Sequence, residues 1–461
     1  MSELFQAINN TTTTTNGMSA YQSSLSANLD LFFVIGTARG EDVWNVFAKA
    51  YQENPNLAVR ILLWSRDIRE GAGERQRFRD ILMQMSRTEG YQELIVSVIK
   101  KIPEVGRWDD LFSLMNTEYE SQALQIVAEG IKNGDGLAAK WSPRKGPIAV
   151  KLREVMKLTP KGYRKTIVNL TKVVEQQMCS GQWDKIEYSH VPSIASKIYR
   201  QAFRRHDENR YDQYLDAVIN GEKKMNVSAI FPHQIVEPFL GYAYNLDAKQ
   251  AEAQWKSLPN YLEGVDERIL TVCDVSGSMH GMPMNVSVGL GLYFSERLEG
   301  VFKDCIVTFS ANPQFVKVKG NTLIDRVNNL SRVDWGMNTD IEAVFQKLLA
   351  TAVREKVSVE HMPTKVLIIS DMQFDQCSSN TGETMFQMLE RKYAEAGYEM
   401  PNLVFWNVAS TNNGNVPVTK NKQGVALVSG SSPSVVQSVL GGEIDPIKVM
   451  LKTVMKDRYT V

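Results

Sequence analysis

Residue types that often anchor chemistry are scarce in this sequence. Its 461 residues include only 4 cysteines and 5 histidines. The cysteines lie far apart and form no CxxC pair, so we expect neither a disulfide framework nor a zinc knuckle. The histidines show no HExxH or His-x-His spacing, which argues against a histidine-based metalloenzyme.

Long apolar runs are also missing. No apolar stretch approaches the roughly 18 residues that a membrane-spanning helix needs. The first residues, MSELFQAINNTTTTTNG, have neither the basic start nor the apolar core of a secretion signal. We therefore expect a cytoplasmic protein with no membrane partner, and the length favours at least two domains.

Net charge of either sign is absent from the whole chain but not from its parts. The segment from Lys132 to Arg205 contains 16 Lys and Arg against 5 Asp and Glu, a net charge of +11. Such an excess is typical of a surface that binds a phosphate-rich partner, although a solvated helical surface can carry it as well.

The pattern of apolar residues divides the chain into three parts. Residues 1–24 are rich in Thr, Asn and Ser, which predicts a flexible polar tail. In residues 25–262, segments such as EDVWNVFAKAY and NLAVRILLWSRDI repeat apolar residues at helical intervals between short Gly or Pro breaks. This pattern favours an α-helical domain of stacked, HEAT-like repeats.

Residues 263–461 show a different pattern. The short β-branched and aromatic runs RILTVCDV, CIVTFS, TKVLIISD and NLVFWNVAS alternate with helix-like segments near residues 284–298, 340–354 and 384–393. The alternation predicts a Rossmann-like, doubly wound sheet that is mostly parallel, and hence a multidomain protein of α and α/β class. Ligands of such sheets bind at the carboxyl ends of the strands.

One candidate site follows directly from that rule. In CDVSGSM, directly after a strand-like run, Asp274, Ser276 and Ser278 fall on one side of an extended chain. Their hard oxygen atoms suit Mg²⁺, Mn²⁺ or Ca²⁺, but three groups cannot fill an octahedron. Thr339 opens a predicted helix and Asp371 ends a predicted strand, which places both at the same sheet edge. We therefore predict a site for one divalent cation, with Mg²⁺ preferred, formed by all five residues.

A nucleophilic serine is a weaker interpretation of the same stretch. The sequence DVSGSM lacks the first glycine of a Gly-x-Ser-x-Gly elbow. His280 is too close in sequence to serve as the orienting base.

The five residues resemble the metal-ion-dependent adhesion site of von Willebrand factor A domains. The resemblance implies that Ser276, Ser278 and Thr339 bind the cation directly, whereas Asp274 and Asp371 act largely through water. It also implies an open coordination position for an oxygen atom, such as a carboxylate of a protein partner.

A helical array followed by an A domain resembles the Ro autoantigen and its TROVE relatives. Segments such as RDIREGAGERQRFRDIL and IPEVGRWDDL resemble a TROVE-like domain-of-unknown-function family of plants, fungi and phages, over residues 31–461. In Ro proteins the helical repeats close into a ring. The resemblance to Ro implies a non-enzymatic protein that binds structured or misfolded non-coding RNA.

The +11 segment supplies the candidate RNA-binding residues. Basic side chains alternate there with aromatic ones, as contact with RNA phosphates and bases requires, although core packing is the favoured interpretation of each aromatic residue taken singly. The candidates are Lys140, Arg144, Lys145, Lys151, Lys161, Arg164, Lys165, Lys172, Arg200, Arg204 and Arg205. The main alternative is a protein scaffold whose metal site captures an acidic residue of a partner. A metal-dependent nuclease is disfavoured because no second carboxylate cluster accompanies the site.

Overall fold

The computed structural model describes residues 8–38, 41–171, 173–241, 247–309, 312–333, 339–375, 385–409, 415–441 and 444–461. An all-helical region over residues 27–257 is followed by an α/β domain with a mostly parallel sheet, as the sequence predicted. Within the described ranges, no helix combines the length and the apolar character needed to cross a membrane.

The helical region is a succession of short helices. Several begin at the predicted signals. The Asn54 side chain accepts a hydrogen bond from the Leu57 N–H at the helix that starts with Pro55. Thr159 accepts one from the Gly162 N–H at the helix that starts with Pro160. The helices are α2 (Ala27–Ile35), α3 (Trp44–Glu53), α4 (Pro55–Arg66), α5 (Gln76–Met85), α6 (Gln92–Val105), η1 (Trp108–Leu114), α7 (Glu120–Lys132), α8 (Gly136–Trp141), α9 (Pro147–Met156), α10 (Pro160–Leu170), α11 (Val174–Cys179), η2 (Trp183–Lys185), η3 (Tyr188–His190), α12 (Ser193–Ile219), α13 (Pro232–Leu240) and α14 (Ala248–Ser257).

The α/β domain is built on a six-stranded sheet with the order β5-β4-β3-β6-β7-β8. All neighbours are parallel except the antiparallel edge pair β4 and β5. The strands are β3 (Ile269–Cys273), β4 (Cys305–Thr308), β5 (Phe315–Lys317), β6 (Lys365–Ser370), β7 (Asn402–Asn407) and β8 (Val425–Ser429). The chain moves outward in one direction after β3 and in the other after β6, so the strand order reverses between these two central strands.

Helices accompany the sheet. α15 packs against β3, β4 and β6, and α20 packs against β8. The helices of the domain are η4 (Gly277–Met279), α15 (Met282–Arg297), η5 (Gly300–Phe302), α16 (Leu323–Leu330), α17 (Ile341–Glu355), η6 (Val359–His361), α18 (Met385–Glu395), η7 (Pro433–Val435), α19 (Val436–Val439), α20 (Pro446–Val454) and η8 (Asp457–Tyr459).

The first helices of the helical region dock on the last strand of the sheet. The side chains of Ser429 and Asn407 donate hydrogen bonds to the backbone oxygens of Phe32 (2.6 Å) and Phe33 (3.1 Å) at α2. A side chain at Gly36 would come within 2.7 Å of Ser429 Oγ, so the close approach requires a glycine. α4 also contacts α20 and η8, which completes this junction.

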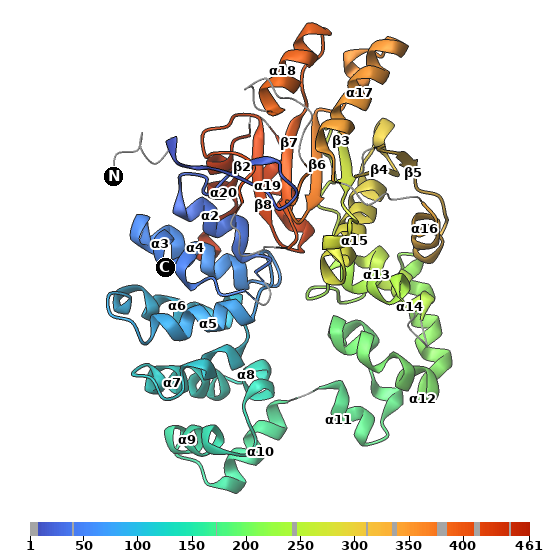
Figure 1. Cartoon of the computed structure of the whole chain (residues 1–461). Coiled ribbons are helices and arrows are strands. Elements are labelled where there is room, and N and C mark those ends of the chain that lie inside the picture. The colour runs from blue at the N-terminus through green and yellow to red at the C-terminus, as the bar shows by residue number, and fades with distance from the viewer. Residues whose placement is uncertain are drawn as a thin grey trace.

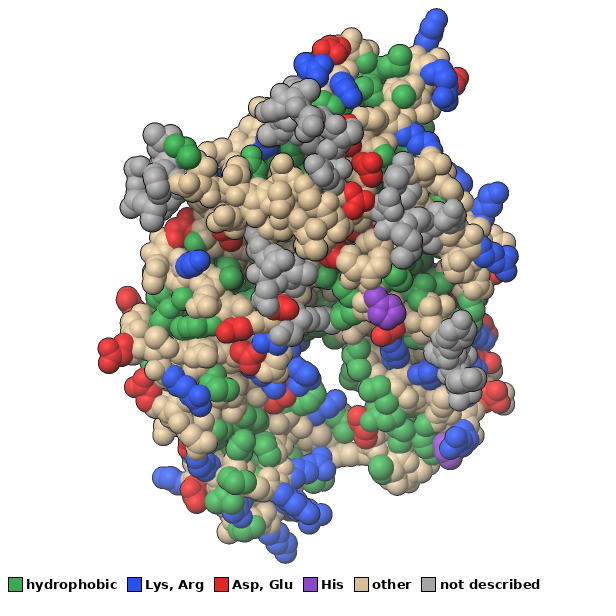
Figure 2. Space-filling view, in the orientation of Figure 1, with side chains coloured by type: hydrophobic (Ala, Val, Ile, Leu, Met, Phe, Trp, Pro, Cys, Tyr) green, Lys and Arg blue, Asp and Glu red, His purple; other side chains and the backbone are tan. Residues whose placement is uncertain are grey.

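The last helices of the helical region dock on the other side of the domain. α13 packs along α15, and α14 packs against α16. A Cβ atom at Gly289 of α15 would lie 2.7 Å from the backbone nitrogen of His233 in α13. The helical region therefore begins and ends on the α/β domain, and the whole chain forms a closed ring (Figure 1). Figure 2 shows the opening that the ring encloses.

Two hydrophobic cores hold the ring together. The larger one runs without a break from α2 to α10, through α13 and α14, and across the α/β domain. The smaller one lies in the arm formed by α11, η3 and α12 and is rich in tyrosine: Tyr188 and Tyr211 contact Phe203, and Tyr214 packs against Tyr188.

The N-terminal residues differ from the expected flexible tail. Residues 8–24 have a defined conformation, in which β1 (Thr11–Thr13) pairs antiparallel with β2 (Ser19–Tyr21). β2 in turn bridges to the α/β domain, since Tyr21 and Val416 exchange two backbone hydrogen bonds of 2.9 Å. Threonine favours extended backbone, and the buried Met18 anchors the hairpin, so low average hydrophobicity did not prevent ordering.

Candidate cation site and basic surface

The candidate cation site begins where β3 leaves the sheet. Asp274 directly follows the strand and is fully buried. One of its carboxylate oxygens accepts the Ser276 N–H at 2.9 Å, and the other accepts the Ser370 hydroxyl at 2.6 Å. Because Ser370 is the last residue of β6, these bonds hold the carboxylate across the carboxyl ends of the two central strands.

The two predicted serines lie next to each other at this edge. Ser276 Oγ and Ser278 Oγ are 3.1 Å apart. Ser276 is buried, whereas Ser278 is exposed to solvent and hydrogen-bonds the Asp371 carboxylate. Four of the five predicted residues are thus joined by hydrogen bonds or adjacent contacts at one sheet edge.

Thr339 reaches the site through the segment that follows Asp371. Gln373 donates its N–H to Asp371 Oδ1 at 3.1 Å, and its backbone oxygen accepts the Thr339 hydroxyl at 2.8 Å. Met372 between them has a φ of 66°, a conformation that residues with side chains rarely adopt. This strained turn aims the Gln373 carbonyl at Thr339, and strain of this kind is concentrated at functional sites.

The electrostatics of the site favour a cation. Burial raises the pKa of Asp274 to about 6, and the nearby Asp371 charge raises it further, against the lowering effect of the Ser370 hydrogen bond. Burial also raises the pKa of Asp371. Two buried carboxylates with raised pKa values beside three hydroxyl groups form a hard-oxygen donor set, which fits Mg²⁺ or Mn²⁺.

Hydroxyl groups are essential to any cation site here. Within the part of the chain that the structure describes, no three His, Cys, Asp or Glu side chains gather in a way that could hold a metal ion. A cation at this edge would therefore depend on Ser276, Ser278 and Thr339 as well as on the two aspartates.

Sequence reasoning missed several polar neighbours of these five residues. Asp375 accepts the Thr339 N–H at 2.8 Å and its hydroxyl at 3.2 Å. The run SDMQFD contains Asp371 and Asp375, so the sequence does carry a signal for a second aspartate near the site. Asn16 and Gln373 gave no such signal, because their contacts depend on a hairpin 323 or more positions away in sequence.

The structure brings five of the predicted RNA-binding residues to one end of the helical arm. The loop before α9 lies against α10, where the Tyr163 hydroxyl donates to the Pro143 carbonyl at 2.9 Å. The five exposed cations around this contact are Arg144, Lys145, Lys161, Arg164 and Lys165. We call them the α9–α10 cluster. Figure 2 shows Lys and Arg side chains gathered over this part of the molecule.

The other predicted cations do not join this cluster. Lys151 forms an ion pair of 2.5 Å with Glu120, and Arg204 is held by Asp212 at 2.7 Å and by Asp247. Arg200 donates to a backbone oxygen of its own helix, α12, at 2.6 Å. Arg205 is exposed, but it lies on α12, on the opposite arm of the ring. Lys172 falls outside the described residues.

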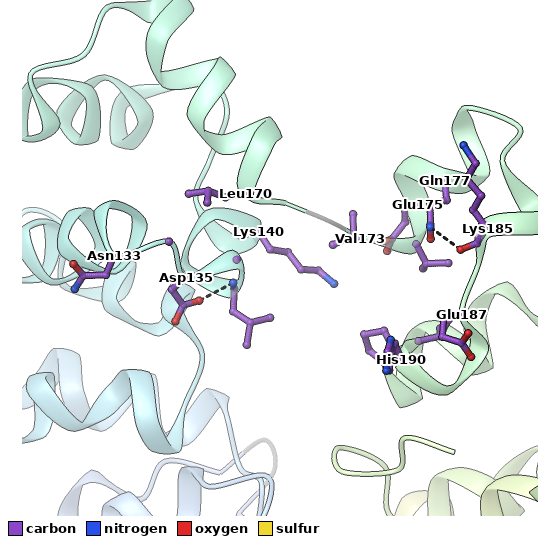
Figure 3. A pocket seen from close by; sticks show the side chains of 16 residues that line it. Asn133, Asp135, Lys140, Leu170, Val173, Glu175, Gln177, Lys185, Glu187 and His190 are labelled. Atoms are coloured by element: carbon purple, nitrogen blue, oxygen red, sulfur yellow. Dashed lines mark hydrogen bonds between the residues drawn. The ribbon is translucent and has the colours of Figure 1, made fainter. Parts of the chain in front are cut away.

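Lys140 lies apart from both groups and faces the opening of the ring. Figure 3 shows its side chain extending from α8 toward the α11 arm, into a hollow of about 770 Å³. An adjoining hollow of about 780 Å³ is bordered by α5 and α8 on one side and by α12 on the other. The opening therefore contains two adjoining hollows, which lie between α5 and α8 on one side and α11 and α12 on the other.

The walls of this second hollow have unlike chemistry. On one side Arg107 stacks over the Trp141 ring at 3.9 Å, and Arg75 is exposed nearby. On the other side Ile194 and Ile198 of α12 are 37% and 62% exposed. Arg75 and Arg107 were not among the predicted residues, because they lie outside the +11 segment.

Fold and site together define a class of protein: a helical array closed into a ring by a doubly wound α/β domain, with a carboxylate-and-hydroxyl site where the strand order reverses. Two domain families match this division. Residues 14–89 and 140–264 match the domain of unknown function DUF2828, and residues 268–458 match the domain of unknown function DUF7788.

A relative of similar length matches across both domains. The uncharacterized protein L728 of Acanthamoeba polyphaga mimivirus is 30% identical over an alignment of 498 positions. The alignment covers 95% of this chain and 86% of that protein. The chain belongs to the family of this viral protein. The DUF2828 match begins at residue 14, between the two strands of the N-terminal hairpin.

Proposed function

We propose that the protein is a non-enzymatic RNA-binding protein resembling Ro, which holds structured or misfolded non-coding RNA on a basic ring. The observation that carries the proposal is the closed helical ring with a cation-lined opening and the α9–α10 cluster at the end of one arm. The proposed site of action is cytoplasmic, and no membrane is involved.

The chemistry of these surfaces suits single-stranded RNA. Exposed lysine and arginine side chains bind phosphates with little sequence preference. Trp141 lines the opening together with the Arg107 guanidinium stacked on its ring, and Ile194 and Ile198 offer apolar surface to unstacked bases. Arg75 and Lys140 supply positive charge from the same wall, so one strand could contact both kinds of surface.

We further propose that the α/β domain is a von Willebrand factor A-type domain that binds one Mg²⁺. Ser276, Ser278 and Thr339 would hold the ion directly, and Asp274 and Asp371 would hold it mainly through water. When bound, the cation would supply an open coordination position for an oxygen atom of a partner. The buried carboxylates and adjacent hydroxyls support this assignment.

Charge reversal in the α9–α10 cluster tests the RNA-binding proposal. The variant combines Lys161→Glu, Arg164→Glu and Lys165→Glu, all at exposed positions of α10. Filter binding with a labelled single-stranded RNA of mixed sequence should show weaker binding for every sequence. The slope of log affinity against log salt should become shallower by about 2, or about 0.7 for each lost phosphate contact.

A matched control makes the same charge change elsewhere. Lys303, Lys319 and Lys356 are exposed on the α/β domain, and their replacement by glutamate should leave the salt slope unchanged. Equal losses in the two triple variants would mean a nonspecific effect of net charge. Failure to recover any RNA after crosslinking in cells would overturn the proposal.

A second candidate function is a protein scaffold in which the cation captures an acidic residue of a partner. The site supports it because Ser278 is exposed at the sheet edge, where a partner can approach. Asp274→Ala or chelation should then abolish partner capture, while nuclease treatment should have no effect. Capture that survives chelation would contradict this role for the site.

A further inference from the structure

The turn between β1 and β2 lies directly on the candidate cation site. The side-chain amide of Asn16 donates to the Gln373 backbone oxygen at 2.8 Å and is 3.4 Å from Thr339 Oγ1. Thr339 Oγ1 is one of the three oxygens proposed to bind the cation directly. Asn16 therefore lies between the solvent and the Thr339 side of the site.

Further polar contacts fix the turn in this place. The Thr15 N–H donates to Gln373 Oε1 at 3.0 Å, and the Thr14 hydroxyl donates to the Phe374 backbone oxygen at 2.6 Å. Gly17 bridges to Asp375, the neighbour of Thr339. Every one of these contacts is made to residues 373–375, the segment that follows Asp371 and Met372.

The contacts are of a kind that a competing ligand can replace. The contacts of Thr15 and Asn16 are hydrogen bonds that are only partly buried, and each contributes only modestly to stability in water. The Asn16 side chain is otherwise exposed, whereas Thr14 and Met18 on either side of the turn tip are buried and anchor the hairpin. Ser278 remains exposed, so a cation can enter while the turn stays in place.

We propose that the turn Thr14–Gly17 covers the side of the cation site to which a partner would bind. A partner protein that presents a carboxylate displaces this turn. The inference rests on the cation site of the proposed function. The Asn16 amide presents its N–H₂ group to this face, and such a group cannot bind a cation. A carboxylate can, so an acidic side chain competes successfully once the cation is bound. Without the cation, the turn stays in place and the acidic side chain does not bind.

Peptide binding to the full-length chain tests this. The probe is an oligoglutamate peptide with Mn²⁺, measured by calorimetry. Asn16→Ala should tighten peptide binding about three- to tenfold, as expected when one or two polar contacts no longer compete. Asn16→Asp should do the opposite, because a carboxylate within the chain would occupy the open position: Mn²⁺ should bind more tightly and the peptide more weakly.

Asn415→Ala is the matched control. The Asn415 amide also holds the hairpin, by donating to the Thr13 backbone oxygen at 3.2 Å, but it contacts none of the five site residues through that bond. This variant should leave peptide affinity unchanged. If it tightens binding as much as Asn16→Ala does, general loosening of the hairpin explains the effect and the proposal is wrong.

Hydrogen–deuterium exchange supplies a second readout. Backbone amides of residues 14–18 should exchange faster when the peptide and Mn²⁺ are both present, but not with the peptide in chelator. Peptide binding without faster exchange would overturn displacement of the turn while leaving the cation site intact. If neither the wild type nor Asn16→Ala binds Mn²⁺, the cation site itself fails, and Asp274→Ala gives the baseline for that comparison.

Discussion

At the scale of single residues, Asp274 determines the character of the candidate site. Its carboxylate is fully buried, and both oxygens accept hydrogen bonds from groups that also fix the strand ends. A buried carboxylate without a counterion is costly to ionise, which is why its pKa rises to about 6. The residue is thus stable either when protonated or beside a cation.

The stability of the metal-free protein should fall as pH rises from about 4 to about 6. In this window the folded chain holds a proton on Asp274 that the unfolded chain releases, because burial raises the pKa from the ordinary aspartate value of 3.8 to about 6. This difference in pKa corresponds to a loss of stability on the order of 3 kcal/mol above pH 6. Urea unfolding in chelator across this range measures it.

Divalent cation should reverse this loss. Mn²⁺ binds the ionised site, so it should raise the free energy of unfolding near neutral pH and have little effect near pH 4. Asp274→Asn should remove the cation effect and weaken the pH dependence, of which the part due to the raised pKa of Asp371 remains. A cation effect of equal size at both pH values, or in the asparagine variant, would contradict the assignment.

The sequence predicted the members of the site better than their surroundings. Asp274, Ser276 and Ser278 follow from a fixed spacing after a strand, and Thr339 and Asp371 from the rule that ligands gather at carboxyl ends. Asn16 could not be predicted, because its role depends on a hairpin that folds back across the whole chain. Lys151 and Arg204 carry the right charge, but their carboxylate partners are distant in sequence.

At the scale of secondary-structure elements, α15 joins the two parts of the molecule. It covers β3, β4 and β6 on one face and packs along α13 of the helical region on another. Ten of its residues are buried, including small ones such as Ser287, Gly289 and Gly291. These small residues let its backbone approach both neighbours closely.

Gly289→Ala should destabilise the protein by about 1–3 kcal/mol, the usual cost of overpacking a tight contact. The added methyl group would lie 2.7 Å from the His233 nitrogen and 2.8 Å from its Cα atom, and backbone atoms cannot move aside as a flexible side chain can. Chemical denaturation measures the change. Gly241→Ala is the control, because no atom lies within 4 Å of that position and its φ of −123° suits alanine.

Four of the six strands of the large sheet were predictable, whereas β5 and β8 were not. The four predicted strands correspond to β3, β4, β6 and β7, each with a β-branched or aromatic run of four to six residues. β5 spans only Phe315–Lys317 at the sheet edge, too short for any periodicity to be visible. The threonine run of β1 predicts a flexible tail from its composition, but the strand is ordered because pairing with β2 supplies the stability that this composition lacks.

At the scale of the whole molecule, the last residues of the chain complete the ring. Tyr459 of η8 is fully buried, and its hydroxyl donates to Asp67, the C-cap of α4, at 3.2 Å. Arg458 binds the same carboxylate and donates to the Glu104 backbone oxygen at 3.0 Å. Residues 458 and 459 thus bind the early part of the helical region, at α4 and α6.

Tyr459→Ala should destabilise the whole ring by about 3–5 kcal/mol, the usual cost of truncating a fully buried aromatic residue. Because one hydrophobic core runs through both domains, calorimetry should show one transition moved to lower temperature. Lys456→Ala, at an exposed position nearby, should change little. Two separate transitions in the tyrosine variant would mean that the domains fold independently.

The closure of the ring could be expected only through resemblance. Helical spacing predicts helices but not the curvature with which they stack. The two junctions depend on particular close approaches, such as Gly36 against Ser429, which no periodicity encodes.

The contact between α2 and β8 also has a consequence for biosynthesis. Phe32 and Ser429 are 397 positions apart, so the first helix is complete long before its partner strand is made. At about 5–20 residues per second, translation of the intervening chain takes roughly 20–80 s. During that time the apolar face of α2 has no partner strand, and a nascent chain is open to aggregation or capture by a chaperone. Premature termination before residue 425 would leave this face permanently uncovered and should mark the product for degradation.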